Sequence, residues 1–448
     1  MSSCTGPTSP VTDPRSIMKP ATKLMGAAVI AITALALSAC STAAPAPAKA
    51  AAAPGSVSLR MTTWTADPTQ LALFNSIADN YKETHPEIKS ITFDSLPFAD
   101  YTTTITTQIA GGQQPDLAWV LETDAPDFVS SGALKPLTDS LKATKGYDFA
   151  DINTDTTKLW TTGGKLYAYP FSTSPFVVFA NDDVLAAAGE PTSAELKSEG
   201  KWDWKDIAEV GAQVNAKTGK QGMVIRDFNY LTWSNLATVW DSFGAAPWSE
   251  DGKTCTFTSK KMVDAFTYLH DATFKQHAFP GPGVSADFFA GDSAFTVTQI
   301  SRATLLTNAF KWNVLPLPKG DAGQGNVVGQ AGIGVLAKSA HADEATEFLA
   351  YFTNPTNAKQ LAAFFPPPRT SLLNATTLAA TNKTLSKQQI DDVVIPSFKN
   401  AETKPSHTNS AEIAAQVKTA LDPMWQSDAN VSSVLKGVCK AITPLLGS

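Results

Sequence analysis

Apolar and polar residues alternate over residues 57–64, which is the spacing of a β-strand with one buried face. From residue 68 onward the apolar positions recur three and four apart, which predicts a helix over 68–84 that ends before a His-Pro pair. A second strand is expected at 88–94, a second helix at 98–109 and a third strand at 114–120. This alternating order is typical of a parallel α/β sheet.

In parallel α/β sheets, ligands bind beyond the carboxyl ends of the strands. Residues 64–67 follow the first predicted strand, and residues 122–124 follow the third. Their aromatic and polar side chains are therefore candidates for ligand binding. For Asp67, Glu122 and Asp124 the alternative is helix N-capping or a solvated loop charge.

The beginning of the chain has the pattern of a secretory signal. Lys19 and Lys23 precede an uncharged apolar run over 24–37, which is shorter than the ~20 residues that a membrane-spanning helix needs. The run ends in Leu-Ser-Ala-Cys at Cys40, which resembles the bacterial lipobox. That resemblance implies cleavage after residue 39 and diacylation of Cys40, and the alternative is an ordinary cleaved signal with an incidental cysteine.

Residues 41–55 are rich in Ala and Pro, with Lys49 as their one charge, so they predict an extended tether. The expected organisation is a signal peptide at 1–39, followed by a lipid anchor and tether at 40–56. The folded part is then extracytoplasmic, anchored to the bacterial cell membrane as a lipoprotein.

Composition narrows the possible partners and the redox state. The chain of 448 residues has net charge −6, and without residues 1–39 it has 32 basic and 40 acidic residues, or −8. This balance argues against nucleic acid or anionic lipid as the partner. Cys255 and Cys439 are the cysteines left in the folded part, and an oxidising compartment favours a disulfide between them. Two buried free thiols are the alternative.

Short motifs occur in a fixed order along the chain. Residues 110–117 (AGGQQPDL) resemble the "aaGxxPDv" signature of the family 1 extracellular solute-binding proteins, the substrate-capturing lipoproteins of ABC sugar importers, which have the maltose-binding-protein fold. Further segments resemble family motifs in the family's order; they are residues 132–137, 164–171, 179–185, 289–295, 315–318, 332–335 and 345–352.

The resemblance implies an α/β, two-lobed, periplasmic-binding-protein-like fold of type II. Each lobe is a mixed sheet flanked by helices, and the chain crosses between the lobes three times, near 171–175, 328–330 and 366–369. The implied lobes are 57–172 plus 331–366 for lobe 1, and 176–328 plus 371–448 for lobe 2.

A sugar site needs aromatic planes for the C–H face of the ring and planar polar groups for its hydroxyls. By the resemblance, Trp64 and Trp233 are expected in the site, with the core as the alternative, and Trp119 is left open between the two. The polar candidates lie at strand ends and crossings; they are Asp67, Glu122, Thr123, Asp124, Ser174, Gln299, Gln330 and Arg369. For Arg369 the alternative is an acidic partner across the hinge.

Nothing in the sequence indicates catalysis, a metal or a cofactor. The five histidines lack metal-ligand spacing, and H-E-x-x-H, C-x-x-C, P-loop and G-x-S-x-G motifs are absent. We therefore expect a monomeric binding lipoprotein that captures a sugar or oligosaccharide by hinge closure and delivers it to ABC permease subunits. One alternative is a secreted glycoside hydrolase or lyase. Another is the same fold with a polyamine or glycerol phosphoester, the latter predicting cleft arginines among Arg226, Arg302 and Arg369.

Overall fold

The computed structural model describes residues 52–226 and 232–447. The predicted signal peptide, the lipidation candidate Cys40 and most of the tether lie outside the described residues. Within the described ranges, no helix combines the length and the apolar character that crossing a bilayer requires.

The first elements form the predicted alternation of strands and helices. They are β1 (Val57–Thr63), α1 (Pro68–Lys82), β2 (Ile88–Ser95), α2 (Tyr101–Ala110) and β3 (Leu117–Leu121). β1 lies between β2 and β3 and is parallel to both, so the predicted parallel order is confirmed. α1 begins after Asp67, whose carboxylate accepts from the backbone N–H groups of Thr69 (2.7 Å) and Gln70 (3.1 Å). Pro68 follows at the first helical position, where its missing N–H costs nothing.

The described strands include one mixed sheet, in the order β2-β1-β3-β12-β6-β8-β7. Its remaining strands are β6 (Ala168–Asn181), β7 (Gln221–Ile225), β8 (Ser293–Gln299), β9 (Trp312–Leu315), β12 (Val327–Val335) and β13 (Glu402–Thr403). Short hairpins are made by β4 (Thr161–Thr162) with β5 (Lys165–Leu166), and by β10 (Lys319–Gly320) with β11 (Gly323–Gln324).

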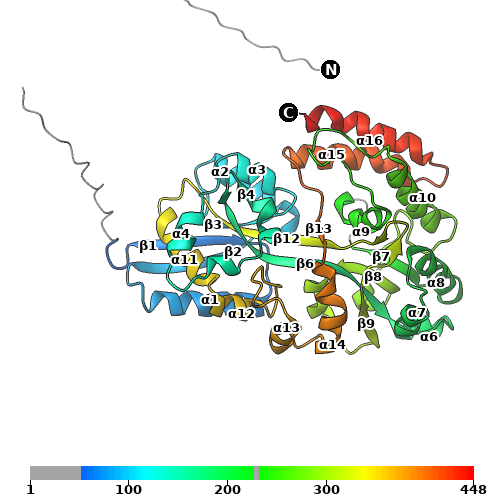
Figure 1. Ribbon diagram of the computed structural model, residues 1–448, viewed down its shortest axis with the longest axis horizontal. Helices are drawn as coiled ribbons and strands as arrows, with labels where there is room; N and C mark the ends of the chain where they lie inside the picture. Colours follow the sequence, from blue (N-terminus) through cyan, green and yellow to red (C-terminus); the bar gives the residue numbers. More distant parts are fainter. Residues whose placement is uncertain (1–51, 227–231, 448) are drawn as a thin grey trace, which may run out of the picture. The chain divides into compact units, whose positions relative to one another are not determined.

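β6 and β12 connect the two halves of the sheet, as Figure 1 shows. β6 pairs antiparallel with β12 over residues 168–175, and then with β8 and β9 over 176–181. β12 in turn pairs with β3 through residues 331–335 and with β13 through Val327 and Val328. Both strands therefore belong to both halves.

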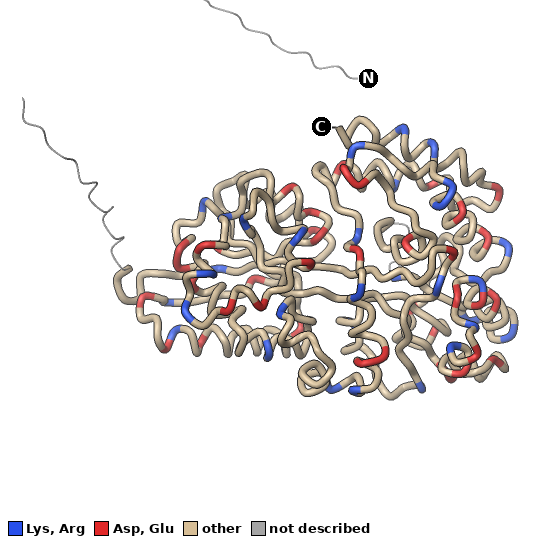
Figure 2. Tube along the Cα trace, viewed as in Figure 1, with Lys and Arg blue, Asp and Glu red and all other residues tan. Residues whose placement is uncertain are grey.

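Helices lie above and below the strands (Figure 1). Besides α1 and α2 they are α3 (Ala125–Ser130), α4 (Thr138–Ala143), α5 (Thr154–Thr157), α6 (Asp182–Ala187), α7 (Ser193–Ser198), α8 (Trp204–Thr218), α9 (Ala237–Trp240), α10 (Lys260–Phe274), α11 (Ala342–Phe352), α12 (Pro355–Leu361), α13 (Ala375–Thr381), α14 (Lys387–Gln389), α15 (Ser410–Leu421) and α16 (Val431–Leu446). Acidic and basic residues are interspersed along them rather than separated (Figure 2). The predicted class, an α/β fold with a mixed sheet flanked by helices, is confirmed.

Within residues 52–226 and 232–447, buried apolar side chains form three separate cores. The first core joins β1, α1, β3 and α11, through residues such as Met61, Phe74 and Phe348. The second core joins α8, α10, α15 and α16, and the third lies around α13 and the segment after α14. Successive residues of β6 point to opposite faces, so Val178 enters the second core and Phe179 the third.

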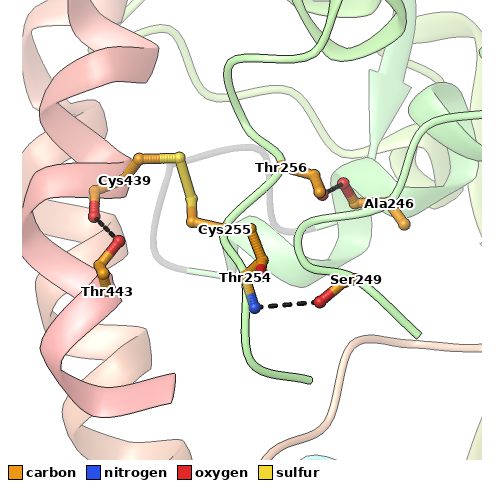
Figure 3. Close-up of a disulfide and its surroundings, with 7 residues drawn as sticks. All are labelled: Ala246, Ser249, Thr254, Cys255, Thr256, Cys439 and Thr443. Atoms are coloured by element: carbon orange, nitrogen blue, oxygen red, sulfur yellow. Dashed lines mark hydrogen bonds between the residues drawn. A yellow bond between two sulfur atoms is a disulfide. The ribbon is translucent and has the colours of Figure 1, made fainter. Parts of the chain in front are cut away.

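The structure contains a disulfide between Cys255 and Cys439, 184 residues apart in sequence (Figure 3). Their Cα atoms are 5.4 Å apart, within the usual range for a bridge. Cys255 precedes α10 and Cys439 lies in α16, and both side chains pack against the second core. The bond therefore ties α16 to the segment that precedes α10.

Replacing both cysteines by serine is expected to lower the free energy of unfolding by about 2–4 kcal/mol, because the unfolded chain loses a constraint on a long loop. Urea unfolding followed by tryptophan fluorescence measures this difference. Dithiothreitol serves as the control, since it should destabilise the wild type and leave the double variant unchanged. Equal unfolding midpoints for wild type and variant contradict the prediction.

Candidate ligand-binding site

A cavity of about 310 Å³ lies where four strand ends meet. Trp64 follows β1, Glu122 follows β3, Arg226 follows β7, and Gln299 ends β8. We call this the central cavity. Its lining comprises Trp64, Phe98, Leu121, Glu122, Phe171, Ser172, Ser174, Arg226, Thr232, Asn235, Gln299, Ser301, Arg302, Gly329, Gln330, Ala331, Phe365 and Lys404. The location agrees with the rule that ligands bind beyond the carboxyl ends of parallel strands.

Small residues of β6 and β12 line the part of the cavity that adjoins the centre of the sheet. Gly329 pairs with Ser174, and Ala331 with Ser172. Ser174 Oγ accepts from the backbone N–H of Ser301 at 3.1 Å, which fastens the segment after β8 to β6. Short side chains at these paired positions leave volume beside the strands for a ligand.

Trp64 forms an aromatic wall of the cavity. Its ring meets Tyr101 at 5.1 Å and Trp119 at 4.8 Å between centroids, both edge to face. Phe98, in the 3₁₀ turn before α2, packs edge to face against Trp64 at 6.0 Å and is 50% exposed. These contacts fix the orientation of the Trp64 ring.

Planar polar groups lie on the side of β7 and β8. The Arg226 guanidinium donates to Gln299 Oε1, and Asn235 Nδ2 donates to the Arg226 carbonyl at 3.1 Å. A Cβ at residue 329 would clash with the Gln299 side-chain amide, so the glycine leaves room for Gln299 to lie over β12. Guanidinium and amide groups offer donors in fixed planes, which suits recognition of paired oxygens.

A buried ion pair between Glu122 and Lys404 forms another part of the lining. Lys404 Nζ lies 2.7 Å from Glu122 Oε1, and the side chains are 11% and 3% exposed. Lys404 is positioned by β13, which pairs with β12, and its N–H donates to the Val328 carbonyl at 3.3 Å. The pair therefore joins the end of β3 to a segment far along the chain.

Five of the predicted ligand residues line the central cavity; they are Trp64, Glu122, Ser174, Gln299 and Gln330. The Gln330 side chain is engaged with neighbouring residues, accepting from Trp160 Nε1 at 3.2 Å and donating to the Thr156 carbonyl at 3.3 Å. A ligand-binding role for these five stays a prediction.

Other residues predicted from the sequence lie outside this lining. Asp67 caps α1, the alternative considered for it. Trp119 is 1% exposed in the first core, behind Trp64. Trp233 is 6% exposed and stacks on Trp240 at 5.9 Å in the second core, while residues 229–231 of the same predicted segment lie outside the described residues. The Thr123 hydroxyl donates a hydrogen bond to Asp124 Oδ1 at 3.5 Å.

Asp124 and Arg369 are also placed elsewhere. Asp124 accepts from Thr102 Oγ1 (2.6 Å) and from Ser410 Oγ (3.0 Å), and burial raises the pKa of its carboxyl. Arg369 is fully buried and donates to the carbonyls of residues 147, 148 and 353 at 2.9–3.2 Å. Asp151 lies 3.6 Å from its guanidinium, so Arg369 has an acidic neighbour, which belongs to the same part of the chain as its carbonyl partners.

Several lining residues were not predicted as ligand contacts, among them Phe98, Asn235, Phe365 and Lys404. Arg226 follows β7, so the strand-end rule could have selected it, yet the sequence suggested it only for a phosphoester ligand. No sequence pattern near Lys404 marks it as a ligand contact, because only the pairing of β13 with β12 brings it to the cavity. Within the described residues, His, Cys, Asp and Glu side chains form no group of three that could hold a metal.

Comparison with known proteins places this sequence in a family. The sequence model of the bacterial extracellular solute-binding proteins matches residues 65–359. The chain belongs to this family, as its motifs indicated.

Three individual proteins are similar to the chain. A lipoprotein of Streptomyces antibioticus is 26% identical over 326 residues, covering 69% of each chain. A lactose-binding protein of Rhizobium radiobacter is 27% identical over 310 residues, covering 64% of this chain and 69% of its own. An ABC substrate-binding protein of Listeria monocytogenes, solved in complex with cycloalternan, has a TM-score of 0.76 at 21% identity and covers 87% of this chain and 99% of its own. The similarity to the Listeria structure shows that the two proteins share a fold.

Replacing Lys404 by methionine is expected to lower the free energy of unfolding by about 3–5 kcal/mol, because Glu122 is left buried without its cation. The Glu122→Gln/Lys404→Met double variant should recover most of the loss, since neither charge then remains. Urea unfolding of the ligand-free proteins measures both effects. Equal stability of the single variant and the wild type contradicts the importance of the pair.

Proposed function

We propose that this solute-binding protein captures a carbohydrate in the central cavity and delivers it unaltered to the permease subunits of an ABC importer. The observation that carries the proposal is the lining of that cavity. An oriented tryptophan faces a space that amide and guanidinium groups also reach. Aromatic faces suit the C–H side of a sugar, and planar polar groups suit its hydroxyls. The names of the lactose-binding relative and of the cycloalternan complex are in keeping with this ligand class.

Closure of two lobes is the proposed mechanism. The lobes are 57–172 plus 331–366, and 176–328 plus 371–448. The distribution of the cores supports this division, since the first core draws on 57–171 and 331–361, and the other two on 176–327 and 375–446, with Ala362 of lobe 1 as the exception. β6, β12 and the segment 366–369 are then the three crossings.

A polar contact across the lobes supports closure. The backbone N–H groups of Asn409 and Ser410, at the start of α15, donate to the Asp127 carboxylate at 2.8 and 3.0 Å. The single Ser410 hydroxyl proton is shared between this carboxylate, at 2.9 Å, and that of Asp124, at 3.0 Å. Asp127 belongs to α3 in lobe 1, whereas α15 packs in lobe 2. A carboxylate at a helix N-terminus is favourable, so this contact stabilises the arrangement in which the lobes are together.

The Asp127→Asn variant is expected to bind sugar about three- to tenfold more weakly, because fewer molecules are closed before binding. Calorimetry measures the affinity, and small-angle scattering of the ligand-free protein should show a larger radius of gyration. Asp139→Asn, an exposed change in α4 of the same lobe, is the control. Unchanged affinity and scattering for Asp127→Asn contradict a role in closure.

The proposed location is the outer side of the bacterial cell membrane, with Cys40 carrying the lipid and residues 41–56 forming the tether. The family is extracellular by description, and one relative is a lipoprotein. An anchored monomer stays near its permease, which raises the effective concentration for docking.

The lining favours binding over hydrolysis. Glu122 is the one carboxylate among the described residues of the central cavity, and it is paired with Lys404. Glycosidases need two carboxyl groups beside the scissile bond. A polyamine is disfavoured, because Arg226, Arg302 and Lys404 line the same cavity.

A thermal-unfolding screen against mono-, di- and oligosaccharides tests the function. A bound sugar at 100 times its Kd should add about 2.7 kcal/mol to the free energy of unfolding. Chromatography after incubation should return the sugar intact. Stabilisation by glycerol phosphoesters alone, or cleavage of the glycan, contradicts the proposal.

Trp64→Ala is expected to weaken sugar binding by about tenfold or more, because the ligand loses an oriented aromatic face. Trp312→Ala, which removes an indole of β9 that lies outside the cavity lining, is the control and should leave the Kd unchanged. Calorimetry with the sugar found in the screen measures both. An unaltered Kd for a folded Trp64→Ala variant removes Trp64 from the site.

A further inference from the structure

A second cavity, of about 510 Å³, adjoins the central one. Arg226 and Arg302 line both, so the two spaces share a wall formed by these side chains. The rest of the second lining comes largely from residues 280–289, between α10 and β8. We call this space the side cavity. No residue of lobe 1 is among its described lining residues, so it extends the site along lobe 2.

The wall of the side cavity is a preformed turn. Pro280 and Pro282 have fixed φ angles, and the Val284 N–H donates to the Gly281 carbonyl at 3.1 Å. Gly283 has a φ of +78°, a value that side-chain-bearing residues rarely adopt. Asp287 accepts from the Phe289 N–H at 2.9 Å and fixes the end of the segment. Little ordering is then needed when a ligand binds there.

The chemistry of the central cavity recurs in the side cavity. Val284 lines the side cavity, and its side chain is 46% exposed. The Arg302 guanidinium lies over the Phe289 ring, 5.1 Å from its centroid, which sets a planar donor group beside an apolar surface. Among the described residues, three large apolar side chains are exposed: Phe98 at the central cavity, Val284 at the side cavity, and Leu305 at neither. An exposed apolar side chain thus belongs to the lining of each of the two cavities.

We propose that the ligand is a carbohydrate of at least two linked rings, one beside Trp64 and the next in the side cavity, between Val284 and the Arg226 and Arg302 guanidinium groups. A single ring held at Trp64 leaves the side cavity to water. A second ring covers Val284 and places its hydroxyls against planar donors. This inference rests on the proposed carbohydrate function.

Calorimetry with two series of sugars tests it: glucose, maltose and maltotriose, and galactose and lactose. In at least one series the full-length protein should bind the longer sugar at least tenfold more tightly than the single ring. Ala286→Trp, which fills the side cavity, and Val284→Asp, which makes its wall polar, should each abolish most of that gain. Both should leave the Kd of the single ring within twofold of the wild-type value.

Leu305→Asp is the matched control, because Leu305 is 47% exposed and lines neither cavity. It should keep the full gain with chain length. Equal affinity for one and two rings, or an equal loss for all sugars in Ala286→Trp and Val284→Asp, overturns the inference and leaves the proposed function standing. Binding of no sugar in either series contradicts both.

Discussion

The antiparallel pairing of β6 with β12 holds the two halves of the sheet together and so sets the position of the central cavity between them. The two strands pass from the first core into the region of the second and third cores, and they are paired over the stretch between. Each strand therefore keeps a ladder partner between the cores, where an isolated strand would leave backbone groups unpaired. Because β1 and β3 end on one side of this stretch and β7 and β8 on the other, their carboxyl ends open into one space.

The contacts between the proposed lobes differ in kind from those within them. Each core is built from apolar side chains that are almost fully buried, so its disruption costs much free energy. Across the lobes, the Asp127 carboxylate meets the backbone N–H groups at the start of α15, and these polar groups can exchange partners with water. Opening thus loses far less than unfolding does. A binding protein that closes by a hinge requires this difference, because its lobes must separate while each core stays folded.

Sequence patterns predicted the first strands and helices, since alternation and helical spacing are local properties. They could not assign each strand-end residue to one role, because a carboxylate such as Asp67 caps a helix or faces a ligand according to how the loop packs. Trp119 lies in a strand buried on both faces, where spacing carries no information about which face meets a ligand. Arg369 depends on carbonyls from residues 147, 148 and 353, which only the tertiary fold brings together.

Hydrogen–deuterium exchange, with and without the sugar identified by screening, tests the central claim most directly: that a carbohydrate binds where both lobes meet. The account predicts slower exchange in segments from both lobes at once, around residues 64–67 in lobe 1 and residues 299–302 and 404–410 in lobe 2. Slower exchange confined to one lobe, or to surfaces away from the central cavity, would contradict it.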